Sequence, residues 1–394
     1  MKKALRKIHL WLSVPTGIII TLVCFSGAML VFEKEITEAI KPELYFVKEA
    51  KGEPIPMQEL MEKVEETLPD SVSISGVTVF ADSTRTYQVS LSKPRRASIY
   101  VNQYTGEVTG RSERLPFFNT MFHLHRWLLG SSSGVGKLIT GICTLVLVFI
   151  LITGILMWLT NRNKPLKASL AIHVTKGWGR FWHDLHVAGG IYTTIFLLAM
   201  ALTGLTWSFS WYRTGFYACF GVESSEKGGA HGEGGNSHGE GRYSHGEGRY
   251  SHGDGRNNHE GKRGEGRGFH RRSPYRHWDD VLNEVALKNP GYQQITLKPE
   301  VAEVVPEGRL SMRAADKYSY DRRSGEITDV QLYSAGKKDT KVRSGVYMVH
   351  TGSWGGLITR ILNFIAALIG ATLPLTGYWL WIRRLMRKRC KTEK

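Results

Sequence analysis

Four long apolar runs interrupt an otherwise polar chain, and they cover residues 10–32, 138–159, 187–211 and 358–382. At about 1.5 Å rise per residue, a helix over any of these runs spans a hydrocarbon core of about 30 Å. The first run is too long for the apolar part of a signal peptide and no small-residue cleavage site follows it, so we expect it to remain as an anchor. The pattern predicts a helical membrane protein with four transmembrane spans.

Clusters of lysine and arginine indicate how the chain is oriented. They lie before the first run, between the second and third, and after the fourth, and they supply much of the net charge of +17. By the positive-inside rule, both termini and the loop 161–186 are cytoplasmic, so the two long polar segments lie outside. Nucleic-acid binding would also suit a basic protein, but cations confined to short clusters beside membrane spans argue against it.

The first long polar segment predicts a small α+β module. Apolar residues at helical spacing predict a helix over 57–67, which a Pro-Asp step ends. Alternating residues then predict strands over 72–80 and 87–91, followed by a hairpin that turns at 103–106, where a glycine suits the positive φ of the turn. Such a module offers no catalytic constellation of its own, so we expect a binding or spacer role.

The second polar segment repeats these features. It predicts a helix over 278–287 and a hairpin in which Asp321 stands where the first hairpin has Asn102. The order of span, module and span therefore occurs twice, as two parallel repeats that an axis along the membrane normal relates.

The predicted organisation has eight parts in order. They are the N-terminus with the first span (1–32), the first outer module (33–122), the second span with an outer histidine motif (123–160), the cytoplasmic loop (161–186), the third span (187–211), the second outer module (212–349), the fourth span with its own outer histidine motif (350–382) and the basic tail (383–394).

An insertion at residues 223–271 interrupts the second module. Its glycine content cannot build a core, so we expect disorder. Histidine-rich tracts can hold zinc, copper or nickel weakly, and the alternative is a plain flexible insertion. The histidines that recur every seven residues are His231, His238, His245, His252 and His259.

Histidines stand beside the spans in equivalent positions of the two halves. His9 and His186 open the first and third spans, whereas His125 and His350 precede the second and fourth. The repeat axis would bring His9 to His186 near the cytoplasmic surface, and His125 to His350 near the outer surface. Polar groups at membrane depth are usually retained for a task. Two facing imidazoles within a helix bundle can hold a six-coordinate haem, so the pattern predicts a haem site at each facing pair.

Neighbouring histidines leave the identity of the ligands open. His123 lies two residues before His125 and points to a different helix face, so only one of them can serve a given site. His183 lies three residues before His186 and shares its predicted helix face. His123 and His183 are therefore alternative ligands.

Glycines within the spans allow two interpretations. Gly17, Gly141, Gly190 and Gly370 could give room for a flat cofactor, or they could serve ordinary close helix contacts, which is the commoner use. Each apolar run also closes with a Ser-Gly or Thr-Gly step.

Other chemistries have little support in the sequence. The four cysteines form no C-x-x-C motif or plausible disulfide pair. A glycine-rich stretch at 134–138 resembles a phosphate-binding loop but lacks its first glycine and the hydroxyl residue after lysine. No flavin or nicotinamide site is evident, so electrons must come from a separate donor.

The chain resembles the PepSY-associated transmembrane family of bacterial inner-membrane proteins, often called iron-regulated membrane proteins, which includes siderophore reductases of the FoxB type. The resemblance covers nearly the whole chain outside the insertion. The stretches that carry it are Lys7-Ile8-His9-Leu10-Trp11-Leu12, Ile99-Tyr100-Val101-Asn102-Gln103-Tyr104-Thr105-Gly106-Glu107-Val108, Leu124-His125-Arg126-Trp127-Leu128-Leu129-Gly130, Asp184-Leu185-His186 and Val349-His350-Thr351-Gly352.

The resemblance implies an inner-membrane b-type cytochrome with two haems, held by His9 with His186 and by His125 with His350. Such a protein passes electrons from a quinol or a cytoplasmic reductase to a ferric siderophore in the periplasm, and iron reduction weakens the grip of the hard oxygen ligands. The chain departs from the family at Asn102, where an aspartate is usual, and in the insertion. The alternative function is a non-redox membrane protein that binds a peptide or a siderophore for transport, sensing or protease regulation.

Overall fold

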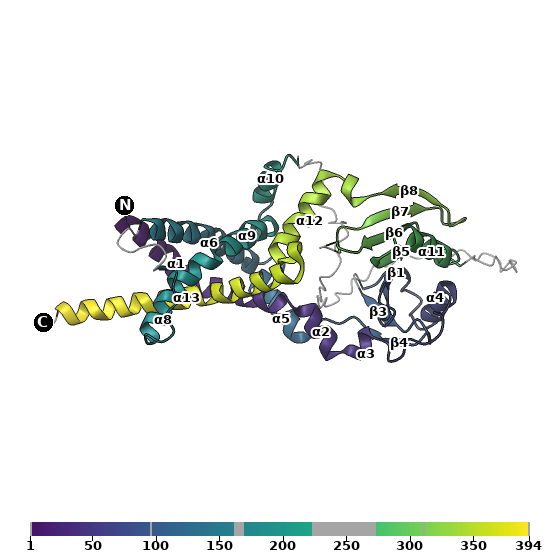
Figure 1. Ribbon diagram of the computed structural model, residues 1–394, viewed down its shortest axis with the longest axis horizontal. Helices are drawn as coiled ribbons and strands as arrows, with labels where there is room; N and C mark the ends of the chain where they lie inside the picture. The colour runs from purple at the N-terminus through teal and green to yellow at the C-terminus, as the bar shows by residue number, and fades with distance from the viewer. Residues whose placement is uncertain (1, 95–96, 161–168, 223–272, 310–311, 393–394) are drawn as a thin grey trace, which may run out of the picture.

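Four helices among the described residues are long and apolar enough to cross a membrane. The computed structural model describes residues 2–94, 97–160, 169–222, 273–309 and 312–392. The spans form a bundle with both chain ends at one tip and the strands at the opposite end (Figure 1). Their main helices are α1 (Lys2–Leu30), α6 (Val135–Leu159), α9 (Gly190–Ser208) and α13 (Gly356–Thr392). The chain is a multi-pass membrane protein, as predicted.

The third span begins before its apolar run. A short helix α8 (Trp178–Asp184) continues through a π-helical turn η1 (Leu185–Gly189) into α9. Single π-helical turns widen a helix locally and often occur at functional sites. The turn begins directly after His183 and Asp184 and contains His186, so helical spacing does not place the two histidines together.

The first outer histidine motif lies on a helix of its own. Helix α5 (Pro116–Trp127) carries His125 and ends at Leu128 and Leu129, whose φ angles are 49° and 67°. A residue in the left-handed region ends a helix because the next amides turn back to its last carbonyls. The predicted unit 123–160 is therefore two helices, and α5 crosses the end of the bundle.

The second outer motif is built in the same way. Helix α12 (Lys338–Thr351) carries His350 and ends at Gly352, whose φ is 75°. A 3-10 turn η3 (Ser353–Gly355) then leads into α13. The predicted unit 350–382 thus also divides into a short histidine helix and a spanning helix.

The two polar segments build a single antiparallel sheet of eight strands in the order β4-β3-β2-β1-β5-β6-β7-β8. Strands β1 and β5 join the two halves along their edges, with Val77 opposite Leu297. The prediction of two separate modules is wrong in this respect, because neither half keeps a free edge at the join. The strands are β1 (Ile74–Phe80), β2 (Tyr87–Leu91), β3 (Ser98–Val101), β4 (Val108–Arg111), β5 (Tyr292–Lys298), β6 (Val301–Pro306), β7 (Asp316–Tyr320) and β8 (Ile327–Gln331).

One hydrophobic core serves both halves of the sheet. Helices α4 (Met57–Glu66) and α11 (Trp278–Lys288), both predicted from helical spacing, contribute their apolar faces to it. Leu60 and Trp278 are almost completely buried there against Val77 and other strand residues. Burial of these large side chains is the main source of stability of the sheet region.

Asp279 connects the two helices through a cap. Both of its carboxylate oxygens accept a hydrogen bond from the amide of Met57, at 2.9 and 2.8 Å. Pro56, the residue before α4, provides no side-chain cap. Asp279 of one half therefore satisfies the first amide of the helix in the other half.

We expect Asp279→Ala to destabilise α4 by about 1–2 kcal/mol, because an N-terminal amide loses its acceptor. Hydrogen exchange of the amides in residues 57–66, measured on the full chain, should then be about 5- to 30-fold faster. The matched control is Asp280→Ala, since Asp280 is exposed and its carboxylate contacts His277 at 3.2 Å rather than the amide of Met57. Equal acceleration in both variants would contradict the capping role.

The two hairpin turns share one internal bond, in which a side-chain oxygen accepts from the amide two residues later. The Asn102 side-chain oxygen accepts from the amide of Tyr104 at 2.9 Å. The equivalent oxygen of Asp321 accepts from the amides of Arg323 and Ser324 at 2.7 and 3.0 Å. Asparagine thus performs the turn-forming role of aspartate, and the departure at Asn102 leaves this turn intact.

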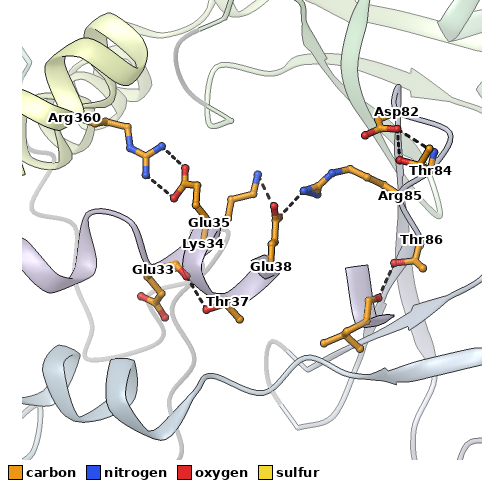
Figure 2. A network of polar contacts seen from close by, with 11 residues as sticks. Glu33, Lys34, Glu35, Thr37, Glu38, Asp82, Thr84, Arg85, Thr86 and Arg360 are labelled. Atoms are coloured by element: carbon orange, nitrogen blue, oxygen red, sulfur yellow. Dashed lines mark hydrogen bonds and ion pairs between the residues drawn. The ribbon is translucent and has the colours of Figure 1, made fainter. Parts of the chain in front are cut away.

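Helix α2 (Glu33–Ile40) connects the bundle to the sheet, together with α3 (Pro42–Tyr45). Figure 2 shows α2 between Arg360 of α13 and Arg85 of the β1–β2 turn. Each glutamate of α2 forms an ion pair with an arginine from a different part of the chain, so α2 connects three parts of the fold. The pairs are Glu33 with Arg114, Glu35 with Arg360, and Glu38 with Arg85.

Candidate functional site: two pairs of imidazoles

The outer pair consists of His125 on α5 and His350 on α12. Their ring centres lie 6.1 Å apart, with an angle of 55° between the ring planes. Both short helices lie where the bundle joins the sheet region (Figure 1). The pair therefore lies at the sheet end of the bundle.

A turn of α1 holds His125 in place. Its Nδ1 lies 2.8 Å from the carbonyl oxygen of Val23. A Cβ built on Gly27 would lie 2.8 Å from Cε1 of this imidazole. Only glycine at position 27 lets the ring approach the helix backbone so closely.

Helix α9 holds His350 in an equivalent manner. Its Nδ1 lies 2.9 Å from the carbonyl oxygen of Met200 and 3.2 Å from the hydroxyl of Thr203. A Cβ on Gly204 would lie 3.1 Å from the Cε1 atom of His350. The Trp207 ring packs edge-on against the imidazole at 5.0 Å between ring centres.

The inner pair consists of His9 on α1 and His186 in the π-helical turn. Their ring centres lie 6.5 Å apart and the ring planes are perpendicular. His9 Nδ1 contacts the hydroxyl of Thr153 at 3.0 Å. His186 Nδ1 contacts the hydroxyl of Thr376 at 2.9 Å and the carbonyl of Leu373 at 3.1 Å. This pair lies at the other end of the bundle, near the chain termini.

Each Ser-Gly or Thr-Gly step is thus the helix turn against which one of the four histidine rings packs. The same number of residues separates His9 from Gly27 as separates His186 from Gly204. From the sequence these steps were only a recurring end of each apolar run, because nothing in it indicates which imidazole each step receives. The four contacts are His125 with the turn at Ser26-Gly27, His9 with Thr153-Gly154, His350 with Thr203-Gly204, and His186 with Thr376-Gly377.

Hydrogen bonds fix the tautomer of every imidazole. Carbonyl oxygens can only accept, so Nδ1 of His125, His186 and His350 must carry the proton. For His9 the acceptor is Thr153, whose own hydroxyl donates to Phe149 and Ile150 carbonyls at 2.9 Å. Each Nε2 therefore bears a lone pair, which is the form of imidazole that binds a metal.

The spacing of the rings fits a metal bound between them. Two metal–nitrogen bonds of about 2.0 Å, with each ring centre about 1.1 Å behind its nitrogen, predict ring centres about 6 Å apart. The observed separations are 6.1 and 6.5 Å. Rotation about the metal–nitrogen axis leaves the bond unchanged, so both angles between ring planes are compatible.

Each pair offers two imidazole ligands, a number that can be compared with what a bare ion and a haem require. Within the described residues, no group of three or more histidine, cysteine, aspartate or glutamate side chains could hold a metal. A tetrahedral ion needs about three or four protein ligands. Two axial imidazoles suffice when a macrocycle provides the other four nitrogens. The residues present therefore fit haem.

His123 and His183, the alternative ligands, lie outside the pairs. The His123 ring packs edge-on against Trp127, at 4.9 Å between ring centres, and its Nε2 is buried without a partner. His183 Nδ1 contacts Asp184 at 3.2 Å. The structure therefore brings His125 and His186, not their neighbours, to His350 and His9.

Asp184 is a buried polar residue that sequence reasoning overlooked. Only 4% of it is exposed, and its carboxylate contacts Nδ1 of His173 and Nε of Arg180, each at 2.8 Å. These bonds anchor the segment that contains His173 to the third span, directly before the turn that carries His186. Its position between His183 and His186 was the available signal, because carboxylates are rarely buried unless paired.

The span glycines, for which both a cofactor space and close helix contacts were open, serve close helix contacts. A Cβ on Gly17 would lie 2.6 Å from the Tyr378 hydroxyl, and one on Gly370 would lie 2.8 Å from Leu197. Gly141 similarly faces Phe209, and Gly190 faces Leu373. These positions are filled by neighbouring side chains, as in ordinary close helix contacts.

The five histidines of the insertion, from His231 to His259, lie outside the described residues.

Comparison with known proteins agrees with this architecture. No curated protein matches the chain. The family model described as the PepSY-associated TM region matches residues 6–384, which includes nearly all of the four spans, both imidazole pairs and the eight-stranded sheet. The chain therefore belongs to the PepSY-associated transmembrane family.

Proposed function

We propose that this protein is a di-haem b-type cytochrome that carries electrons across the inner membrane to ferric iron held by a siderophore in the periplasm. The proposal rests on the two imidazole pairs. In each pair the distance between the ring centres would allow one metal ion to bind between the rings, and each Nδ1 atom is hydrogen-bonded to a neighbouring helix. Histidines with only a structural role at a membrane surface would not need the same Nδ1 contact in all four positions. Ligands of a cofactor do need fixed tautomers and positions.

Each residue around the pairs has a defined task in this proposal. Haem, when bound, supplies a one-electron couple between ferric and ferrous iron. The carbonyls of Val23, Met200 and Leu373 orient the imidazoles and make Nε2 more basic. The spans and the surrounding lipid would shield both sites from water. The low dielectric of these surroundings also affects the redox potential.

The two sites would lie at different depths in the membrane. His9 and Val23, which contacts the outer pair, are both on α1, and the helical rise separates them by about 21 Å along the axis. Electrons would enter at the His9–His186 end, where the basic clusters indicate the cytoplasm, from a quinol or a cytoplasmic reductase. They would leave at the His125–His350 end, which faces the sheet region.

The choice of a ferric siderophore as acceptor is supported by the family resemblance and by metal chemistry. Siderophores hold iron with hard oxygen ligands, which suit Fe(III) better than Fe(II). One-electron reduction would therefore release the metal. In this proposal the sheet region would lie on the side where the electron leaves, so it would be the part of the chain available to hold the chelate.

A vesicle assay tests the proposed function. Purified protein is inserted into proteoliposomes that enclose dithionite, with a ferric trihydroxamate chelate and a membrane-impermeant ferrous chelator outside. We expect the ferrous complex to form outside vesicles that contain the wild-type chain, and His350→Ala to reduce its rate to that of empty vesicles. Equal rates in wild type, variant and empty vesicles would reject the reductase function and favour the non-redox alternative.

A further inference from the structure

A cationic cavity lies at the end of the bundle that carries the chain termini. It has a volume of about 510 Å³ and is formed between α8 and the last turns of α13. Arg180 and His183 line it from α8, and Arg383, Arg384 and Arg387 line it from α13. Among the described residues, no acidic side chain lines this cavity.

Most of this positive charge is uncompensated. Arg180 donates to the buried carboxylate of Asp184 at 2.8 Å. Arg383 lies over the Trp379 ring at 5.0 Å, and the Cβ-free backbone of Gly179 lets its guanidinium approach α8. In the part of the chain that the structure describes, Arg384 and Arg387 have no carboxylate partner. Among the described residues, three guanidinium groups therefore face one cavity that no carboxylate lines, which favours an anionic ligand.

The cavity lies at the depth of lipid headgroups. On α13 its arginines directly follow the apolar run 358–382, which is long enough to cross the hydrocarbon core. On α8 its residues directly precede the apolar run that begins at 187. Trp178, which is 75% exposed and stacks on Trp182, lies beside it, as aromatic side chains do at membrane interfaces.

We propose that this cavity binds the phosphate of an anionic phospholipid headgroup. Guanidinium groups bind phosphate oxygens through paired hydrogen bonds, and basic pockets between membrane helices on the cytoplasmic side bind such headgroups. At this depth, lipid phosphate is the most abundant anion. A bound headgroup would bridge α8 and α13. It would thereby hold the helix that precedes His186 against the helix that its imidazole contacts. The proposal does not depend on haem binding.

The test is lipid binding to the full chain in detergent, measured by native mass spectrometry after delipidation. Phosphatidylglycerol and phosphatidylcholine with identical acyl chains are titrated in turn. We expect the wild-type chain to prefer phosphatidylglycerol. Each arginine contributes about 5-fold near a lipid surface, so the double variant Arg384→Gln, Arg387→Gln should lose about 25-fold of that preference. Both side chains are exposed and unpaired with carboxylates, so the variant should fold.

The matched control is Arg322→Gln, Arg323→Gln, which removes the same charge from an exposed turn of the sheet region. Its lipid preference should equal that of the wild type. An unchanged preference in the cavity variant would overturn the proposal. So would displacement of phosphatidylglycerol by micromolar pyrophosphate, because the cavity would then be a site for soluble anions.

Discussion

Replacing His350 by alanine should remove about half of the bound haem, and replacing His9 should remove the other half. Each substitution deletes one imidazole of one pair, and a haem held by the one remaining imidazole would bind weakly and be lost during purification. The sites use separate residues and lie near opposite ends of α1. Haem per chain, measured as the pyridine haemochrome, should therefore fall by the same amount in each variant.

Controls for this prediction come from the neighbouring histidines. His123→Ala and His183→Ala should keep the full haem content, because neither ring belongs to a pair. His350→Met offers a further check, since a thioether ligand can retain the haem and raises its reduction potential. Loss of all haem from both His350→Ala and His9→Ala, in chains that elute as folded monodisperse protein, would contradict two independent sites.

Gly27→Ala should weaken haem binding at the outer site by about 10- to 100-fold, the usual effect of disturbing the partner of a metal ligand. The new methyl group would lie 2.8 Å from Cε1 of His125. The imidazole would have to move, and its bond to the Val23 carbonyl would be lost. Haem retention during titration with apo-myoglobin, a strong haem acceptor, measures the change in affinity.

The same substitution at an equivalent step provides the control. A Cβ on Gly154 would lie 3.6 Å from Cε1 of His9, which is an ordinary contact. Gly154→Ala should therefore leave both haems in place. If Gly27→Ala and Gly154→Ala released haem equally, the effect would come from general helix packing. The proposed role of Gly27, to let the His125 ring approach the helix backbone, would then be wrong.

The sequence was sufficient to predict the spans and to suggest which histidines meet. Apolar runs of membrane length have few alternatives as folded structures, because an unpaired backbone in lipid is costly. We predicted the pairing of His9 with His186 by relating the two sequence repeats through an axis along the membrane normal. The structure brings these residues together, and it does the same for His125 and His350.

Long-range contacts were beyond the sequence. Strand β5 reads Tyr292-Gln-Gln-Ile-Thr-Leu-Lys298, in which polar residues hide the alternation, and its partner β1 is more than two hundred residues away. Local pattern contains no information on such pairing. The sequence therefore indicated two modules where the chain builds one sheet.

The details of the histidine sites were also hidden from the sequence. The π-helical turn changes the direction of His186 relative to His183, and a helix-spacing argument cannot anticipate it. The sequence also leaves the role of each span glycine open. The side without a Cβ can face a histidine ring, as at Gly204, or a neighbouring helix, as at Gly17. Only the three-dimensional packing distinguishes the two.

The haem content and spectrum of the purified wild-type chain test the central claim most directly. Protein from haem-replete cells should contain about two haems b per chain, with the low-spin absorption of bis-imidazole ligation and a Soret band that shifts on reduction by dithionite. Colourless protein, or one haem per chain that no single histidine variant of the pairs removes, would contradict the assignment of the two imidazole pairs.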